Sequence, residues 1–186
     1  MSNITIISGS PSEKTRLNGV FQEVLTYFQA SGYTPEIINV RELPPEALIH
    51  AKFNGEEILD ANKKVEDSNI IVILTPVYKA SFSGVLKTYM DLLPQNSLED
   101  KTILPIAVGG TFGHLLMIDY ALKPVLTTLG ATHILKGVYV LDNQVKKISD
   151  NRYELDSDAK NRINTSLNSL NFNNPSLFTI GNDITI

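Results

Sequence analysis

The sequence has no cysteine among its 186 residues. It can therefore form no disulfide, no thiolate metal site and no cysteine nucleophile. Histidine is also scarce, because only positions 50, 114 and 133 carry it, and their spacing is not that of metal ligands. We expect no metal site in this protein.

A strong charge of one sign is missing as well, and so is any long apolar run. The 16 basic and 20 acidic residues leave a formal net charge of −4, which argues against general binding to nucleic acid or to an anionic membrane. No apolar run has the length of a transmembrane helix. Because the first expected strand begins at residue 4, we expect no signal peptide and a cytoplasmic protein.

The composition that remains is 42% hydrophobic and 19% charged, which is typical of a globular protein with a substantial core. We expect one domain over residues 1–170. Residues 171–186 are rich in asparagine, and we expect them to form a loose tail or an arm across a neighbouring subunit.

The stretch Ile4–Phe28 combines a strand, a loop and a helix. Residues 4–7 are mostly β-branched and favour a strand. From Leu17 onward, apolar residues recur at intervals of three and four, as in a helix that buries one face. The loop between them carries one glycine, the cations Lys14 and Arg16, and four hydroxyl side chains: Ser8, Ser10, Ser12 and Thr15.

Such a loop at a helix N-terminus offers free backbone N–H groups and a positive dipole end to an anion, above all to phosphate. It matches neither the P-loop pattern nor the glycine pattern of dinucleotide-binding folds. It therefore favours a site for a single terminal phosphate group. The alternative is an ordinary strand–helix turn in which Thr15 caps the helix.

Strands alternate with helices along the rest of the chain. We expect further strands at 35–40, 70–74, 102–108 and 132–141 (the last either continuous or broken at Gly137), helices at 56–67, 84–93, 113–129 and 157–170, and a hairpin around 149–151. This alternation predicts parallel βαβ units. The predicted fold class is α/β, a flavodoxin-like five-stranded parallel sheet in the order 2-1-3-4-5 with helices on both faces.

Prolines qualify two of these assignments. Pro44 and Pro45 predict that no helix forms between residues 41 and 55. Pro105 lies inside an expected strand, which favours an edge or bulged position or a locally interrupted ladder.

Ligands of open parallel sheets bind beyond the carboxyl ends of the strands, where the loops 8–16, 75–83 and 109–114 should meet. The second loop offers a rigid apolar and aromatic wall, and the third offers adjacent glycines that let a flat ligand approach the backbone. The residues concerned are Pro76, Val77, Tyr78 and Lys79, and then Gly109, Gly110 and His114. A phosphate site at one end and a surface for a flat heteroaromatic ring at the other describe a site for FMN.

Plainer interpretations of these loops stay open at this point. The alternative for Tyr78 is a partly exposed loop aromatic, and the alternative for His114 is a polar residue at a helix start that contacts no ligand. Asp91 and Asp119 are interpreted as solvated or capping residues rather than catalytic ones.

Three separated motifs resemble the NADPH-dependent FMN reductase family. The third is most similar to one branch, the SsuE-type flavin reductases of two-component alkanesulfonate monooxygenase systems. The resemblance spans residues 4–142 and fades beyond residue 143. Its motifs are Ser8–Ser12 with Thr15–Leu17, then Thr75–Lys87, and then Gly109–Thr111, His114–Leu116 and Asp119–Leu126.

The resemblance implies hydride transfer from NADPH to FMN, giving reduced flavin for a partner flavin-dependent monooxygenase. It implies phosphate contacts by Ser8, Ser10, Ser12, Thr15, Arg16 and Leu17. It implies ring contacts by Pro76, Val77, Tyr78, Lys79 and Ser81, with Gly109, Gly110, Thr111 and His114 on the far side. Because hydride passes directly between stacked rings, the reaction requires no acid–base residue, and we name no catalytic residue.

The expected 113–129 helix contains Pro124, which removes the donor that the Tyr120 carbonyl would use. We expect a π-bulge there, or alternatively a simple proline kink. In the resembling branch, this helix lies at a subunit interface near the flavin, and a π-bulge at the matching tyrosine accompanies flavin exchange.

The same expected helix has two apolar faces. A second face too apolar for water predicts a homodimer or homotetramer. The face expected in the core carries Leu115, Ile118, Leu122, Val125 and Leu129, and the face expected under a second subunit carries Leu116, Met117, Tyr120 and Ala121.

Competing functions remain on the same fold. One is a reductase of quinones, azo or nitro compounds that keeps FMN tightly bound. Another is a flavodoxin-type electron carrier, which the missing T-x-T-G-x-T-like phosphate loop and the mild acidic excess argue against. A flavin-free interaction module is the last, and the convergence of three suitable loops argues against it. The choice between NADPH and NADH, the acceptor and the oligomer size stay open.

Overall fold

A computed structural model of the chain describes residues 3–150 and 152–170. The predicted tail at residues 171–186 lies outside the described residues. Short apolar runs form the strands of the central sheet, and a separate hairpin follows. The strands are β1 (Ile4–Ser8), β2 (Glu36–Asn39), β3 (Ile70–Tyr78), β4 (Ser81–Phe82), β5 (Thr102–Gly109), β6 (His133–Ile134), β7 (Val138–Leu141), β8 (Val145–Ser149) and β9 (Arg152–Leu155).

Helices follow most of the strands, as the alternating pattern predicts. They are α1 (Arg16–Ala30), α2 (Pro45–Ile49), α3 (Glu56–Glu66), α4 (Gly84–Met90), α5 (Lys123–Thr128) and α6 (Ser157–Asn168). Short 3₁₀ turns are η1 (Val40–Glu42), η2 (Phe112–His114) and η4 (Asp142–Gln144), and η3 (Ile118–Leu122) is a π-helical turn. None of the helices in the described ranges is long and apolar enough to cross a membrane.

The central sheet confirms the flavodoxin-like prediction, with small differences in strand count. Its order is β2-β1-β3-β5, and the fifth position is shared by β6 and β7, which both pair with β5 in parallel. The sheet therefore has seven strands instead of the predicted five, because the last strand is split and because β4 folds back antiparallel onto β3.

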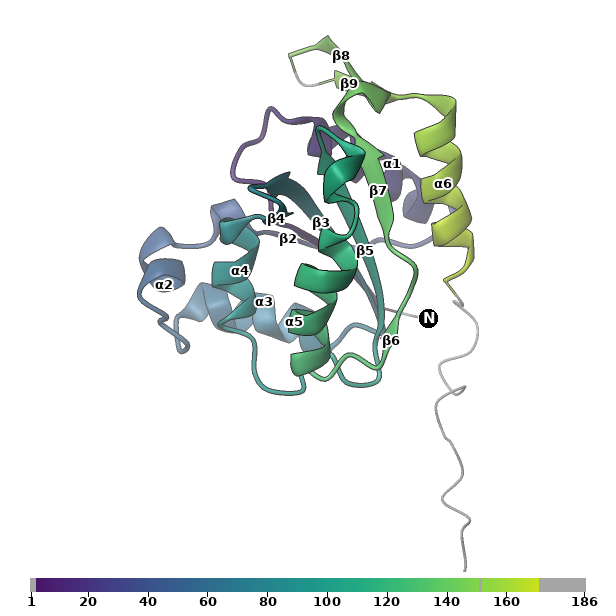
Figure 1. Cartoon of the computed structure of the whole chain (residues 1–186). Coiled ribbons are helices and arrows are strands. Elements are labelled where there is room, and N and C mark those ends of the chain that lie inside the picture. The colour runs from purple at the N-terminus through teal and green to yellow at the C-terminus, as the bar shows by residue number, and fades with distance from the viewer. Residues whose placement is uncertain (1–2, 151, 171–186) are drawn as a thin grey trace, which may run out of the picture.

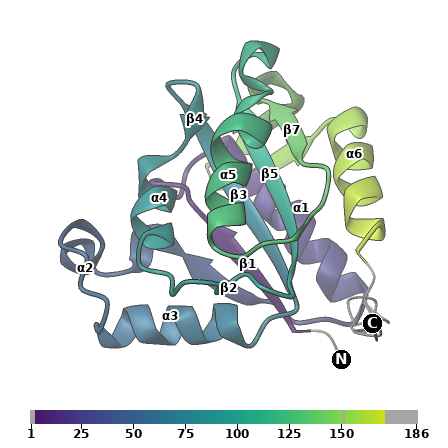
Figure 2. The ribbon, with the colours of Figure 1, turned by 60° about the horizontal axis from the view of Figure 1, so that its bottom comes forward.

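Helices cover both faces of the sheet (Figure 1, Figure 2). Side chains alternate along each strand, so Val72 and Leu74 meet the helices α1 and α6, whereas Ile71 and Ile73 meet α3, α4 and α5. Because both faces are buried, β3 is apolar at nearly every position, as expected for a central parallel strand.

Pro105 lies in the middle of the sheet, opposite the interruption between β6 and β7. The Thr102 N–H donates to the Asn69 carbonyl on one side, and the Ile103 carbonyl accepts from Leu135 on the other. By alternation, the nitrogen of Pro105 faces the gap between β6 and β7, where no ladder bond is lost. Of the predicted options, the interrupted ladder is therefore correct.

The prediction that no helix forms between residues 41 and 55 is wrong. Pro45 occupies the first position of α2, where its missing N–H is not needed and its fixed φ favours a helix. The helix is short, Pro45–Ile49, and it ends before Ala51, whose φ is positive.

The predicted hairpin after the sheet is confirmed. Strands β8 and β9 pair antiparallel outside the central sheet and lie at one end of the molecule, near the start of α1 and beside α6 (Figure 1).

Candidate functional site

A cavity of about 350 Å³ lies at the carboxyl edge of the sheet, where β3 and β5 end and α1 begins. All three predicted loops contribute to it, and so does the chain after β7. Its lining consists of Lys14, Thr15, Arg16, Leu17, Pro76, Val77, Tyr78, Val108, Gly109, Gly110, Asp142, Lys147 and Tyr153.

Three hydroxyl residues of the predicted phosphate loop line a different hollow. Ser8, Ser10 and Ser12 border a space of about 220 Å³ that they share with Thr15 and Arg41. Ser8 and Ser10 are buried, and the Ser10 hydroxyl donates a 2.8 Å hydrogen bond to the Ser12 carbonyl. The Ser10 hydroxyl therefore stabilises the loop, while Ser12 is exposed. Also outside the lining of the larger cavity are Lys79, Ser81, Thr111 and His114.

The loop before α1 instead offers backbone donors. Among the described residues, the N–H groups of residues 13–16 donate to no protein atom. Thr15 is the N-cap residue by position, but its side chain makes no capping hydrogen bond. Unpaired N–H groups and the positive end of the helix dipole together suit an anion. The residues at the start of α1 thus fit a terminal phosphate group.

Buried hydrogen bonds tie the first two loops together. The Gly9 N–H donates to the Leu74 carbonyl at 2.8 Å, and the Ser83 hydroxyl donates to the Gly9 carbonyl at 2.6 Å. The same hydroxyl accepts from the Leu86 N–H and caps α4, while the Ser83 N–H donates to the Thr75 hydroxyl at 3.0 Å. A Cβ at Gly9 would lie 2.6 Å from the Leu86 Cβ, so only glycine allows this approach.

The second loop ends in a tight turn between β3 and β4. Tyr78 pairs with Ser81 across it, and the central residues Lys79 and Ala80 have positive φ angles of 49° and 63°. Such turns match the twist of the flanking strands but usually contain asparagine and glycine, because other residues cost about 1–2 kcal/mol each in this conformation. The turn presents Tyr78, which is 48% exposed, at the cavity.

The two glycines of the third loop have different surroundings. A Cβ at Gly109 would collide with the Tyr139 hydroxyl, whereas a Cβ at Gly110 would meet only the Asp142 carboxylate, at 3.6 Å. Gly109 thus makes room for Tyr139, and Gly110 leaves its side of the cavity open. Burial, and then the charge of Asp142, raises the pKa of the Tyr139 hydroxyl, which donates to the Thr111 carbonyl at 2.9 Å.

Three lining residues that follow β7 were not predicted from the sequence. Asp142 comes directly after a parallel strand, so the carboxyl-edge rule could have identified it. Lys147 and Tyr153 face each other across β8 and β9. Nothing in their spacing indicates a ligand, and they reach the cavity because the hairpin packs on α1.

Asp91 and Asp119 agree with their interpretation as solvated or capping residues. Each is partly exposed and forms an ion pair with a lysine four residues away, Lys87 or Lys123. Nowhere in residues 3–150 and 152–170 do three or more histidine, aspartate or glutamate side chains gather where they could hold a metal ion.

An apolar surface borders the third loop, and we call it the outer patch. It consists of Phe112, Leu115, Leu116 and Tyr120, and the side chain of Tyr120 is 78% exposed. The segment that carries it is a 3₁₀ turn followed by the π-helical turn Ile118–Leu122, and Pro124 lies in the first turn of α5. The predicted π-bulge is therefore confirmed, and the simple proline kink is not what forms.

The change of helix type corrects the predicted faces of this segment. Leu115 was expected in the core but is 44% exposed, and Met117 was expected outside but is buried. A 3.6-residue period cannot be continued through a 3₁₀ turn, with 3.0 residues per turn, and a wider π turn. Ile118 and Leu122 are buried, as predicted.

Comparison with known proteins gives related enzymes over most of the chain. The chain is 42% identical over 142 residues to the FMN reductase (NADPH) of Pseudomonas putida KT2440, which covers 76% of this chain and 72% of that protein. It is 36% identical over 166 residues to the FMN reductase (NADPH) of Escherichia coli K12, covering 88% and 85%.

A solved structure agrees with these relatives. The apo form of the NADH:FMN oxidoreductase EMOB superposes with a TM-score of 0.80 at 30% identity, covering 90% of this chain and 87% of that one. The family model of NADPH-dependent FMN reductases matches residues 2–146. With this match across the site and most of the fold, the chain belongs to the NADPH-dependent FMN reductase family.

Proposed function

We propose that the 350 Å³ cavity binds FMN as an exchangeable substrate, which this flavin reductase reduces with NADPH. The observation that carries the proposal is the chemistry of the cavity. Free N–H groups of residues 13–16 lie at one part of it, and an apolar, partly aromatic wall of Val77 and Tyr78 lies at another. FMN has a phosphate at one end and a flat ring at the other, in matching order.

In this arrangement the start of α1 holds the phosphate, with Lys14 and Arg16 adding positive charge. The flavin ring lies between the Val77–Tyr78 wall and the open side of Gly110. When bound, FMN supplies the ring nitrogen that accepts hydride from the nicotinamide. The chain positions the two rings and excludes water, and no side chain has to move a proton.

The outer patch supports two further parts of the proposal. Apolar side chains exposed this densely are rarely left to water, so a second subunit covers them in a homodimer or homotetramer.

The π-helical turn η3 lies between the third loop and α5, where an irregular backbone is easier to distort than a regular helix. Reduced FMN then leaves for a partner flavin-dependent monooxygenase in the cytoplasm.

One observation favours the competing function, a quinone, azo or nitro reductase with tightly bound FMN. The buried hydrogen bonds around Ser83 make two walls of the cavity rigid, and a rigid site suits a permanent cofactor. Steady-state NADPH oxidation separates the two functions. The proposal expects a nearly colourless purified protein whose NADPH oxidation depends on added FMN. A yellow protein that oxidises NADPH with a quinone or azo dye, without added FMN, would establish the competing function.

A further inference from the structure

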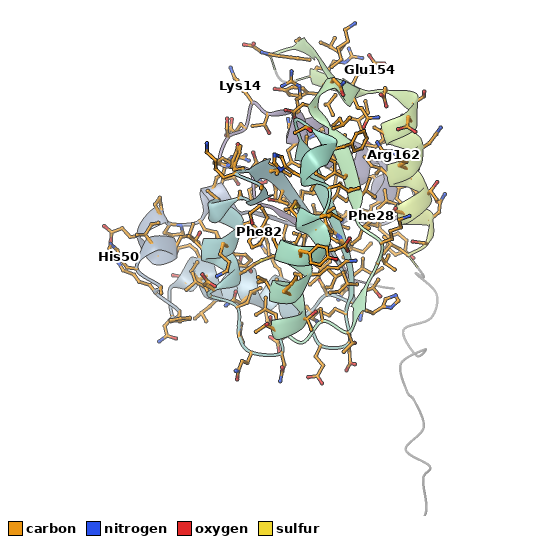
Figure 3. All side chains as sticks on the ribbon, viewed as in Figure 1. Lys14, Phe28, His50, Phe82, Glu154 and Arg162 are labelled. Atoms are coloured by element: carbon orange, nitrogen blue, oxygen red, sulfur yellow. The ribbon has the colours of Figure 1, made fainter. Side chains whose placement is uncertain are left out.

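The β8–β9 hairpin contributes one of two lysines that line the cavity. Lys147 and Tyr153 are cross-strand partners and both belong to the lining, whereas the next pair, Lys146 and Glu154, does not. Side chains alternate between the two faces of a hairpin, so Lys147 faces the cavity and Lys146 faces away. The second lysine is Lys14, from the loop before α1, and Figure 3 shows it at the same end of the molecule as Glu154 of β9.

Close packing fixes the hairpin against α1. The Arg16 side chain donates from Nε to the Val145 carbonyl at 3.3 Å. A Cβ at Gly19, in the interior of α1, would lie 2.7 Å from the Tyr153 Cβ and 3.0 Å from the Val145 Cγ1. Glycine inside a helix is unfavourable, and here it lets the hairpin sit directly on the helix. The backbone at Lys147 is therefore held at a defined place beside the end of the cavity that the proposed function assigns to phosphate.

The two lysines share one counter-ion. Asp150, in the turn of the hairpin, pairs with Lys14 at 3.4 Å and with Lys147 at 3.2 Å. All three side chains are at least half exposed, and ion pairs so exposed are weak. A phosphate monoester carries up to two negative charges and three acceptor oxygens, so it can replace a single carboxylate between two ammonium groups.

We propose that Lys14 and Lys147 form a two-lysine site for a phosphate monoester of a nucleotide, which displaces Asp150 from between them. The inference rests on the proposed function, because it assigns the cavity to nucleotides. Two nucleotides of the reaction carry such a group. FMN has its 5′-phosphate, and NADPH has a 2′-phosphate that NADH lacks.

Comparison of Lys147→Gln with Lys146→Gln tests the site, because the second variant removes the same charge from the opposite face. We expect Lys147→Gln to change either the ratio of FMN to riboflavin affinity or the ratio of the KM values for NADPH and NADH by about threefold or more, as for the loss of one partly exposed charge contact. If the 5′-phosphate is the ligand, FMN affinity falls relative to riboflavin. If the 2′-phosphate is the ligand, the KM for NADPH rises relative to that for NADH.

Two further variants test the direction of the change in selectivity and distinguish it from an effect of misfolding. Lys147→Arg keeps the charge and should restore the ratio that Lys147→Gln changes. Asp150→Asn removes the competing carboxylate and should shift the same ratio in the opposite direction. Equal ratios in Lys147→Gln, Lys146→Gln and wild type would overturn the two-lysine site, and weaker phosphate selectivity in Asp150→Asn would overturn the displacement.

The inference and the proposed function can fail separately. Wild-type protein that does not reduce added FMN with NADPH would contradict the proposed function, while the ratio of FMN to riboflavin affinity would still decide the lysine site. Wild-type protein that reduces FMN normally, with no selectivity change in Lys147→Gln, would overturn the inference alone.

Discussion

The walls of the cavity are built in two different ways. The wall formed by the loops before α1 and α4 is fixed by buried hydrogen bonds through Ser83 and by the close approach of Gly9 to α4. The segment from Gly110 to Leu122 contains a 3₁₀ turn and a π turn, and it exposes the four side chains of the outer patch while Met117, Ile118 and Leu122 are buried. In the proposed function, the rigid wall recognises the ligand, and the irregular segment is where flavin exchanges and subunits meet.

The largest expected effect comes from breaking the rigid wall. Gly9→Val puts a branched side chain where even a Cβ would lie 2.6 Å from Leu86. Overpacking of this kind costs about 3 kcal/mol and should lower the thermal midpoint by about 6–12 °C. Gly84→Ala, at a glycine with open space around its Cβ position, is the matched control in differential scanning calorimetry. A Gly9→Val protein as stable as this control would contradict the close packing of the two loops.

The next effect tests the irregular segment. Deleting Tyr120 removes one residue from the π turn and should convert it into regular helix. We expect FMN to co-purify with this variant and multiple-turnover reduction of free FMN to fall by about tenfold or more, which corresponds to about 1.4 kcal/mol. Absorbance of the purified protein near the flavin band and steady-state rates measure both. A colourless variant with normal turnover would separate the π turn from flavin exchange.

Substitutions at the two adjacent glycines of the third loop should separate an effect on ligand binding from an effect on packing. Gly110→Val should leave the fold intact, because a Cβ there meets only the Asp142 carboxylate at an ordinary contact distance of 3.6 Å, and weaken FMN binding by about tenfold, or 1.4 kcal/mol. Gly109→Ala collides with Tyr139 and should lower stability instead. Thermal melting and FMN titration of both variants separate the effects. A stable Gly110→Val protein with normal FMN affinity would place the ring elsewhere.

The smallest expected effect concerns Tyr139, which joins the third loop to the sheet. Its pKa is raised in the folded state, so the hydroxyl keeps its proton at a pH where the unfolded chain loses it. This contribution to stability is complete below pH 10.0, the ordinary pKa, and is lost as the pH rises through the folded-state pKa. Tyr139→Phe should cost about 1 kcal/mol at neutral pH and flatten the alkaline decline seen in urea melts. If stability declines at alkaline pH in Tyr139→Phe as steeply as in the wild type, other tyrosines cause the decline.

The fold was largely predictable because its signals are local and repeated. Apolar runs such as Ile70–Leu74, alternating with amphipathic segments, fix the layers, and the carboxyl-edge rule then brings Thr15, Tyr78 and Gly110 to one cavity. The buried and exposed positions around Leu115 and Met117 were predicted wrongly, because helical periodicity assumes one helix type throughout the segment.

The finer chemistry of the site depends on contacts that the sequence does not reveal. The sequence does not show which way a loop hydroxyl points, and here the Ser10 hydroxyl donates to the Ser12 carbonyl of its own loop. Lys147 enters the cavity through the packing of a hairpin on Gly19, which has no signal in local spacing.

The central claim is that the cavity holds FMN by its phosphate and its ring but lets it go. Equilibrium titration of the wild-type protein with FMN and with riboflavin, followed by flavin fluorescence, tests it most directly. We predict a micromolar or weaker dissociation constant for FMN and an affinity for riboflavin at least about tenfold lower, the loss expected when the phosphate contacts at the start of α1 are removed. Equal affinities for the two flavins, or nanomolar binding of FMN, would contradict the claim.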